Sequence, residues 1–212
     1  MTNFIPIFPL NIVAYPGERL HLHIFEPRYK QLINDCLQSG KAFGIPTVIN
    51  NNLADTGTLM QIVEVSQVYE DGKMDIKTEG LRVFKVLELV SEIPEKLYSG
   101  AIVHYPDNNM QGNADMMRAL LIGMRAIHSK LDVSKQFAKS DEDLNSYDIA
   151  HHVGLAIEEE YELLQFFWEL QRQEYLKRHL TKVIPMMEEM DALKKKIRQN
   201  GHFKNLEGFN FK

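Results

Sequence analysis

The stretch "IFPLNIVAYPGERLHLHIFEPRYKQLINDCL" (residues 7–37) places a strand pattern directly before a helix pattern. Within residues 19–25 the side chains alternate, with Leu20, Leu22 and Ile24 on one face and His21, His23 and Phe25 on the other. This period of two predicts a strand. Pro27 then suits the first position of a helix, and Gly40 suits its end. We expect one helix over about 27–38, because apolar residues recur there at helical spacing.

The hydrophobic period changes once along the chain, near residue 107. Strand-like segments cover 42–49, 58–90 with a hairpin turn at 70–73, and 99–106, and residues 50–57 are typical of a loop. Helical spacing covers 114–131, a short segment at 146–152, and 157–199. Pro185 is expected to kink or restart the last helix. The pattern predicts a β-rich half with one helix (1–110) and a helical half (111–212).

Composition makes several classes of protein less favoured. The 212 residues carry a formal charge of −5 and a pI near 5.9, and an acidic balance disfavours nucleic-acid binding. Cys36 is the only cysteine, so no disulfide can form within the chain. The N-terminus lacks the basic segment of a signal peptide, and no apolar run is long enough to cross a bilayer. We therefore expect a cytoplasmic protein with no membrane partner.

The opening stretch resembles the start of the Lon protease N-terminal domain family. In that family a Pro-Leu strand, an aromatic-Pro-Gly turn, an alternating strand and a Phe-Glu-Pro-Arg-Tyr helix start follow in the same order. The resemblance continues through "TEGLRVFKVLEL" (78–89), "HYPD" (104–107) and "IEEEYELLQF" (157–166), and it covers roughly residues 5 to 200. One departure is Arg82, which stands one place earlier than the arginine of the family's strand.

The resemblance implies an α+β fold, with a PUA-like β pseudo-barrel followed by a C-terminal helical bundle and a long kinked last helix. It also implies a domain that binds unfolded or exposed polypeptide segments, or a protein partner such as an ATP-dependent protease. The alternative is a PUA-like module that binds RNA or a nucleotide. The acidic charge and the lack of a basic, aromatic strand motif make nucleic acid the weaker choice.

The sequence does not predict an enzyme. No G-x-x-x-x-G-K-[ST] phosphate loop occurs, and "QSGKAFG" lacks both the first glycine and the hydroxyl residue after lysine. No serine stands in a sequence that resembles the Lon peptidase motif. We therefore expect no catalytic residues, no ATP hydrolysis and no cleavage of casein.

Histidines and the single cysteine are the candidates for a metal site. His21 and His23 share one strand face, His151 and His152 are adjacent, and Cys36 is a further donor. No H-E-x-x-H or C-x-x-C spacing connects them, so we predict no metal and no cofactor. The simpler interpretation is a half-exposed strand face, with Phe25 reaching the core, and a buried, unreactive thiol at Cys36.

Aromatic residues of the helical half give the candidate peptide-binding surface, which consists of Tyr161, Leu164, Trp168 and Tyr175. In a single helix over 158–176 these four would share a flank beside the core stripe. If the chain instead breaks near Phe167, Trp168 lies at a corner between two helices. Two roles stay open, because the cluster either packs on the β-rich half or lines a groove for an extended apolar peptide.

The C-terminal segment "HFKNLEGFNFK" (202–212) contains Phe203, Leu206, Phe209 and Phe211. These side chains are too apolar for an idle terminus in an acidic protein. We predict that the segment docks on its own domain or on a neighbouring copy.

Overall fold

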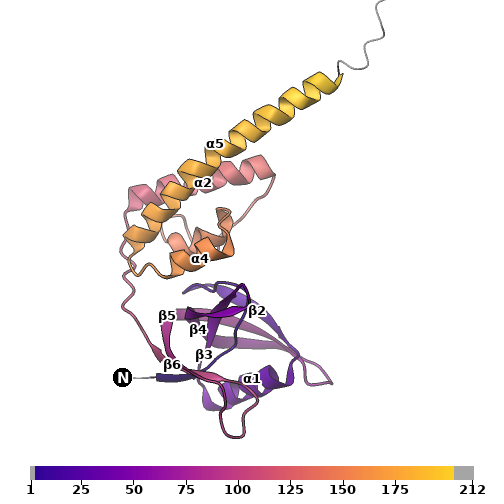
Figure 1. The fold of residues 1–212 in the computed structure, drawn as a ribbon, viewed down its shortest axis with the longest axis vertical. Coiled ribbons are helices and arrows are strands. Elements are labelled where there is room, and N and C mark those ends of the chain that lie inside the picture. Colours follow the sequence, from indigo (N-terminus) through magenta and orange to yellow (C-terminus); the bar gives the residue numbers. More distant parts are fainter. Residues whose placement is uncertain (1–2, 203–212) are drawn as a thin grey trace, which may run out of the picture.

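The computed structural model describes residues 3–202 and shows a β-rich half and a helical half, with one long helix projecting from the latter (Figure 1). An antiparallel sheet followed by helices confirms the predicted α+β class. The strands are β1 (Asn3–Pro6), β2 (Arg19–Ile24), β3 (Phe43–Ile49), β4 (Asn52–Val68), β5 (Met74–Val90) and β6 (Gly100–His104). The C-terminal tail that we expected to dock lies outside the described residues.

The six-stranded sheet is organised around β5. Its order is β1-β6-β5-β4-β3, and β2 pairs with the first part of β5 on the same side as β6. The chain after β1 then reaches β3, where Ile7 pairs with Gly44 and Leu10 pairs with Thr47. These two bridges connect the ends of the sheet, so the strands surround a small core that contains Phe84.

The helix predicted after the alternating strand is α1 (Pro27–Ser39). It begins with proline at its first turn and ends at Gly40, whose φ of 65° is the left-handed conformation that glycine favours. Of the apolar stripe predicted from the sequence, Tyr29, Leu32, Ile33 and Cys36 are buried, whereas its last member, Leu37, is exposed. They pack on the sheet in a second core. Burying such a stripe is the main source of a short helix's stability.

The predicted loop at 50–57 is wrong, because β4 already begins at Asn52. Asn50 and Asn51 form the whole connection from β3, with φ values of 50° and 63°. Two residues with positive φ match the tight hairpin turn whose twist suits antiparallel strands, and asparagine tolerates that conformation. The hairpin predicted at 70–73 is confirmed, since β4 ends at Val68 and β5 starts at Met74.

The helical half follows the predicted segments closely. Its elements are α2 (Ala114–Leu131), α3 (Ser146–Ile149), a 3-10 turn (Ala150–His152), α4 (Ile157–Leu164) and α5 (Glu169–His202). The helix α5 continues through Pro185, so the predicted restart is wrong, and no sharp bend is visible in Figure 1. Pro185 is exposed, and water can therefore solvate the backbone carbonyl that loses its partner. Within residues 3–202 no helix has an apolar stretch that could cross a membrane.

The two halves share one hydrophobic core. Val13, Tyr15 and Val83 of the β-rich half pack with residues of α2, α4 and α5. The turn that carries Tyr15 is held against the sheet, because Gly17 N–H donates to the Gly80 carbonyl at 2.8 Å. A side chain at Gly80 would collide with the Tyr15 carbonyl. The glycine of "TEGLRVF" therefore permits the close approach on which the junction depends.

Candidate functional site

The segment that leaves the sheet pairs with the break between α4 and α5. The Asn109 N–H donates to the Phe167 carbonyl at 2.7 Å, and the Glu169 N–H donates to the Asn109 carbonyl at 2.8 Å. These bonds place Asn109 beside Trp168 in a short parallel bridge. The pairing fixes the corner at which α5 begins.

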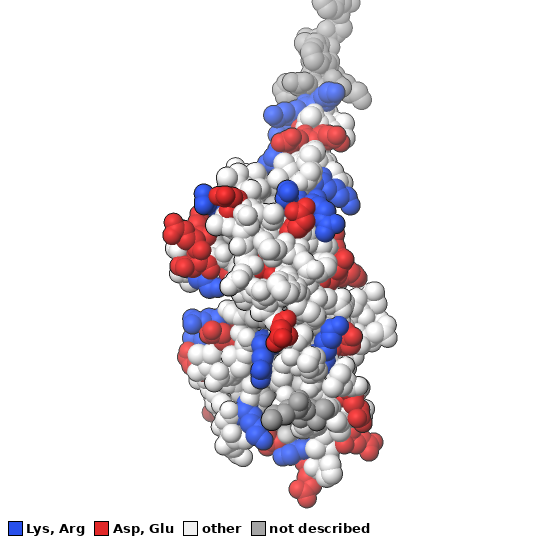
Figure 2. Space-filling model, turned by 90° about the vertical axis from the view of Figure 1, so that its left-hand side faces the viewer, with Lys and Arg blue, Asp and Glu red and all other residues white. Residues whose placement is uncertain are grey.

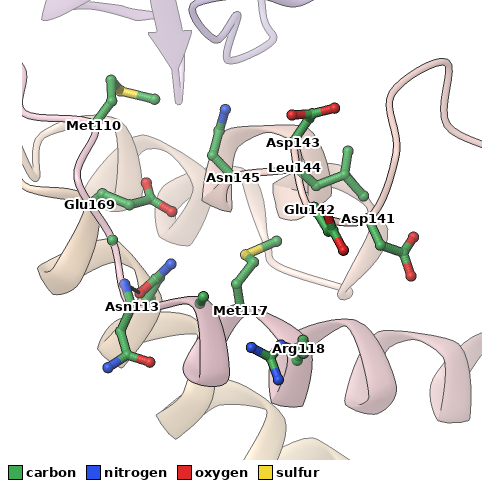
Figure 3. A pocket seen from close by; sticks show the side chains of 13 residues that line it. Met110, Asn113, Met117, Arg118, Asp141, Glu142, Asp143, Leu144, Asn145 and Glu169 are labelled. Carbon is green, nitrogen blue, oxygen red and sulfur yellow. Dashed lines mark hydrogen bonds between the residues drawn. The ribbon is translucent and has the colours of Figure 1, made fainter.

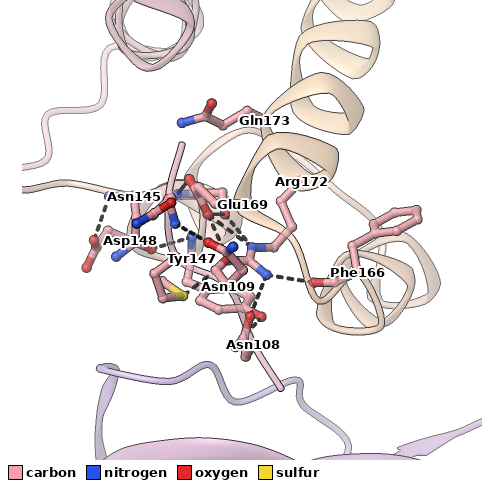
Figure 4. Close-up of polar contacts among 12 residues, drawn as sticks. Asn108, Asn109, Asn145, Tyr147, Asp148, Phe166, Glu169, Arg172 and Gln173 are labelled. Atoms are coloured by element: carbon pink, nitrogen blue, oxygen red, sulfur yellow. Dashed lines mark hydrogen bonds and ion pairs between the residues drawn. The ribbon is translucent and has the colours of Figure 1, made fainter. Parts of the chain in front are cut away.

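A buried ion pair lies behind this corner (Figure 4). The side chains of Arg172 and Glu169 are 0% and 1% exposed, and their nearest nitrogen and oxygen are 2.9 Å apart. The guanidinium also donates to the Asn108 side chain at 2.9 Å and to the Phe166 carbonyl at 2.6 Å. Its carbon lies 4.1 Å from the centre of the Tyr147 ring. A charge can be buried at this depth because its hydrogen-bonding capacity is met by such partners.

The carboxylate of Glu169 is satisfied from the start of α3. Its oxygens accept from the Ser146 N–H at 2.8 Å and from the Ser146 hydroxyl at 2.6 Å. We call Arg172, Glu169 and Ser146 the Arg172 cluster. The neighbouring Asn145 caps α3, because its side-chain oxygen accepts from the Tyr147 N–H and its own N–H donates to the Asp148 carboxylate at 2.9 Å. The cluster and the cap together hold the loop before α3 against the start of α5.

These elements surround an open pocket of about 960 Å³ (Figure 3). Its floor consists of the buried side chains of Met117, Leu144, Glu169 and Gln173. Its rim includes Met110, Asn113, Arg118, Asp141, Glu142 and Asp143, which come from the linker, α2 and the loop before α3. Figure 3 shows these side chains arranged around a common space.

The pocket combines a mostly acidic rim with a floor that is half apolar, where Met117 and Leu144 lie beside Glu169 and Gln173. The Arg125 guanidinium donates to Asp141 at 2.6 Å and holds the pKa of that carboxyl below its usual value. Met110 and Met117 have flexible, polarisable side chains that adapt to ligands of different shape. Among the described residues that line the pocket there is no serine, cysteine or histidine. Its ionisable lining residues are the carboxylates Asp141, Glu142, Asp143 and Glu169, together with Arg118.

A second polar cluster lies at the junction of the two halves. His151 contacts Glu160 through Nδ1 at 2.7 Å and Glu18 through Nε2 at 3.3 Å, and its side chain is 30% exposed. Burial alone lowers the pKa of His151, but the hydrogen bonds to Glu160 and Glu18 outweigh it and raise the pKa to about 9. We call these three residues the His151 cluster. The imidazole is charged at neutral pH and connects the turn after Tyr15 to α4.

The family of the chain follows from a comparison with known proteins. A family model described as the ATP-dependent protease La (LON) substrate-binding domain matches residues 5–182. The chain belongs to this family. A Lon protease from Flavobacterium johnsoniae is 31% identical in an alignment of 99 residues, and the match covers 42% of this chain and 12% of that protein. The family match covers the substrate-binding domain and no ATPase or protease domain.

Two solved structures share the fold. A Lon N-terminal domain protein from Xanthomonas campestris has a TM-score of 0.66 and 23% identity, covering 83% of this chain and 98% of that one. The N-terminal domain of a Lon protease from the Mycobacterium avium complex has a TM-score of 0.59 and 12% identity, covering 84% and 98%. The order of sheet and helices described above is thus that of Lon N-terminal domains.

In this Lon substrate-binding domain the helical segment is broken near Phe167, which is the second of the two geometries predicted from the sequence. Trp168 lies at the corner between α4 and α5 and is 56% exposed. Leu164 is fully buried, so it cannot present its side chain to a peptide. The Tyr161 hydroxyl donates to Asp55 at 2.7 Å, and the Tyr175 hydroxyl donates to Glu162 at 2.9 Å. The four residues do not form one exposed flank, because the break changes the direction of the chain.

The remaining candidates have structural positions. Within the described residues, no group of three or more His, Cys, Asp or Glu side chains could hold a metal. Burial raises the pKa of the Cys36 thiol to about 11, which makes it a poor nucleophile. The prediction that Phe25 reaches the core is wrong, since it is 57% exposed. The strand continues its alternation, so Phe25 stays on the face of His23 while Ile24 is buried.

Arg82, the departure from the family pattern, has a partner in the structure. Its guanidinium lies over the Tyr105 ring, with the carbon 3.7 Å from the ring centre. Tyr105 follows β6, directly before the linker that leads to the pocket. Arg82 therefore helps to position the start of the linker through a cation–π contact.

The pocket and the Arg172 cluster were missed by sequence reasoning. Glu169 and Arg172 are three residues apart on a helix, which is the ordinary spacing of a surface ion pair. The surrounding sequence gives no further signal, because Arg172 lies in a polar stretch between Gln171 and Gln173. The residues of the rim come from three distant segments and share no sequence signal.

Proposed function

We propose that this protein is a non-catalytic recognition module that binds unfolded or exposed polypeptide segments at the pocket and at Trp168. The observation that carries the proposal is the position of Trp168. Its backbone pairs with Asn109, the residue before Met110 on the rim, and Glu169 of the floor follows it directly. An exposed tryptophan whose backbone adjoins the rim of an open pocket is a candidate anchor for an extended chain.

Membership of a substrate-binding family supports a polypeptide ligand, either as a client or as a segment of a partner such as an ATP-dependent protease. The surface gives no comparable support to the RNA alternative. Figure 2 shows positive and negative side chains interspersed over one face of the molecule, with no continuous basic field. The proposed setting is the cytoplasm, where unfolded segments would be met during protein turnover.

The test is a binding titration with a permanently unfolded protein, such as reduced and alkylated lactalbumin. Trp168 is the only tryptophan, so a tryptophan-free unfolded peptide should shift its fluorescence emission on binding. Replacing Trp168 with alanine should weaken binding by about 2 kcal/mol, measured by anisotropy of a labelled peptide. The matched control is Leu97→Ala, because Leu97 is 66% exposed and belongs to the β-rich half.

Three outcomes decide the proposal. A loss of affinity in Trp168→Ala but not in Leu97→Ala, with both variants folded, supports it. Equal affinities of the two variants place the binding surface elsewhere and contradict it. Salt-dependent binding of single-stranded RNA, without binding of unfolded protein, would favour the PUA-like alternative instead.

A further inference from the structure

The last part of α5 carries a row of exposed apolar side chains. Met186, Met190, Leu193 and Ile197 are 54%, 57%, 58% and 63% exposed. They follow one another at spacings of four, three and four residues, which is the a/d pattern of a coiled coil. We call these four residues the α5 stripe. In Figure 1 this part of the helix extends beyond α2 and away from the rest of the molecule.

The α5 stripe is separate from the face that α5 uses to pack on its own domain. Leu176 and Leu180 are buried in the shared core, and Met187 packs against it. Further along, Lys130 of α2 lies 3.7 Å from Asp191 and 3.9 Å from Glu188. At about 100° per residue, Leu180 and Asp191 point about 110° and about 130° away from the centre of the stripe. The contacts with α2 therefore leave the stripe uncovered.

The charges beside the α5 stripe suit a second copy of the same helix. With Met190 at position a, Glu189 is at position g and Lys194 is at the following position e. In a parallel pair of helices, position g of one chain faces the next position e of the other. Glu189 of each copy would thus face Lys194 of its partner, with opposite charge. Among the described residues, no ion pair within the chain involves Glu189.

We propose that the α5 stripe is a self-association surface, on which two copies of this chain pair their α5 helices in parallel. A membrane surface fits this helix less well. Helices that lie on membranes have a broad apolar face and Lys or Arg on the polar face. Here the apolar row is narrow, and the polar positions around it carry both signs, with Glu188, Glu189 and Asp191 beside Lys194, Lys195 and Lys196. The free length is short for a coiled coil, so the dimer should dissociate on dilution.

The first experiment is sedimentation equilibrium of the full chain over a wide concentration range. The wild type should pass from monomer to dimer as concentration rises. Leu193→Glu places a charge in the middle of the stripe and should weaken dimerisation at least about tenfold. Ile122→Glu is the matched control, because Ile122 is 68% exposed on α2 and lies outside the stripe. Equal melting temperatures would show that both variants remain folded.

The second experiment exchanges charges. Glu189→Lys and Lys194→Glu should each weaken the dimer, and the double variant should restore it, because the pair is then reversed but still opposite in sign. A chain that is monomeric at every concentration, or a dimer that tolerates Leu193→Glu, overturns the proposal. Failure of the double variant to restore dimerisation overturns the parallel arrangement. A monomer that binds anionic phosphatidylserine vesicles through Leu193 overturns it in favour of a membrane surface.

Discussion

The two polar clusters of this Lon substrate-binding domain both connect separate segments of the chain, but they differ in how deeply they are buried. The Arg172 cluster lies inside the helical half, and the side chains of its ion pair are at most 1% exposed. The His151 cluster joins the two halves, and its imidazole is 30% exposed. Water screens the second cluster but not the first. Breaking the first therefore leaves a buried charge without a partner, whereas the second can exchange its contacts for water.

The largest effect should come from Arg172→Met. This variant leaves the Glu169 carboxylate buried without its cation, which should lower the free energy of unfolding by about 3–5 kcal/mol. Urea denaturation followed by circular dichroism measures the loss. The control is Arg172→Met combined with Glu169→Leu, which removes both charges and should recover part of the stability. A loss below about 1 kcal/mol in the single variant would show that the depth of the pair does not matter.

Gly80, which lies against the turn at the junction of the two halves, should give the next largest effect. Gly80→Ala introduces a methyl group against the Tyr15 carbonyl, and the backbone of the turn cannot move without losing its bonds to the sheet. We expect a loss of about 1–3 kcal/mol in the free energy of unfolding. Leu81→Ala, at the next and exposed position, is the control and should change stability by less than about 0.5 kcal/mol. Similar losses in both variants would mean that the close approach is not a constraint.

The His151 cluster should make stability depend on pH. The pKa of His151 is about 9 in the folded chain, against an ordinary value of 6.5. Because folding raises this pKa, the contribution of His151 to the free energy of unfolding is fully present below pH 6.5 and is lost as pH rises through about 9. After allowance for solvent screening, we expect it to be about 1–2 kcal/mol.

The measurement is the difference in free energy of unfolding between the wild type and His151→Gln at several pH values. This difference should be largest near pH 6.5 and should shrink toward pH 10. More acidic conditions are avoided because burial lowers the pKa of His152 to about 4, so that residue loses its contribution as pH falls. A difference that stays constant across the alkaline range would assign the cluster a packing role only.

Local signals predicted most of the fold. The predicted bounds of α2 match the observed ones because its apolar spacing lies within the helix itself. Two errors also have local causes. Two adjacent asparagines formed a complete turn where a longer loop was expected, and the exposed position of Pro185 let the helix continue. In each case the residue types correctly indicated a turn or a helix breaker, but the neighbouring structure determined how far its effect extended.

The candidate site could be predicted only in part. The corner at Trp168 was one of two geometries read from the sequence, and the structure has it. The pocket beside it requires Met110, Asp141 and Glu169 to meet, and they are far apart in the chain. Nothing in a helical pair such as Glu169 and Arg172 indicates burial, because the same spacing occurs on exposed surfaces. Burial depends on the linker and on α3, which close over the pair only in the folded chain.

The smallest effect is expected at an ion pair that is more exposed than either cluster. Arg19 and Glu79 face each other on β2 and β5, with Nε and Oε2 3.3 Å apart, and their side chains are 74% and 40% exposed. Bulk water solvates both charges before and after the contact forms, and ordering two long side chains opposes the attraction. Arg19→Ala should therefore lower the free energy of unfolding by no more than about 0.5 kcal/mol, and added salt should reduce that loss further. A loss as large as that of Arg172→Met would mean that burial does not separate the clusters, and the contrast between them would have to rest on the number of hydrogen bonds instead.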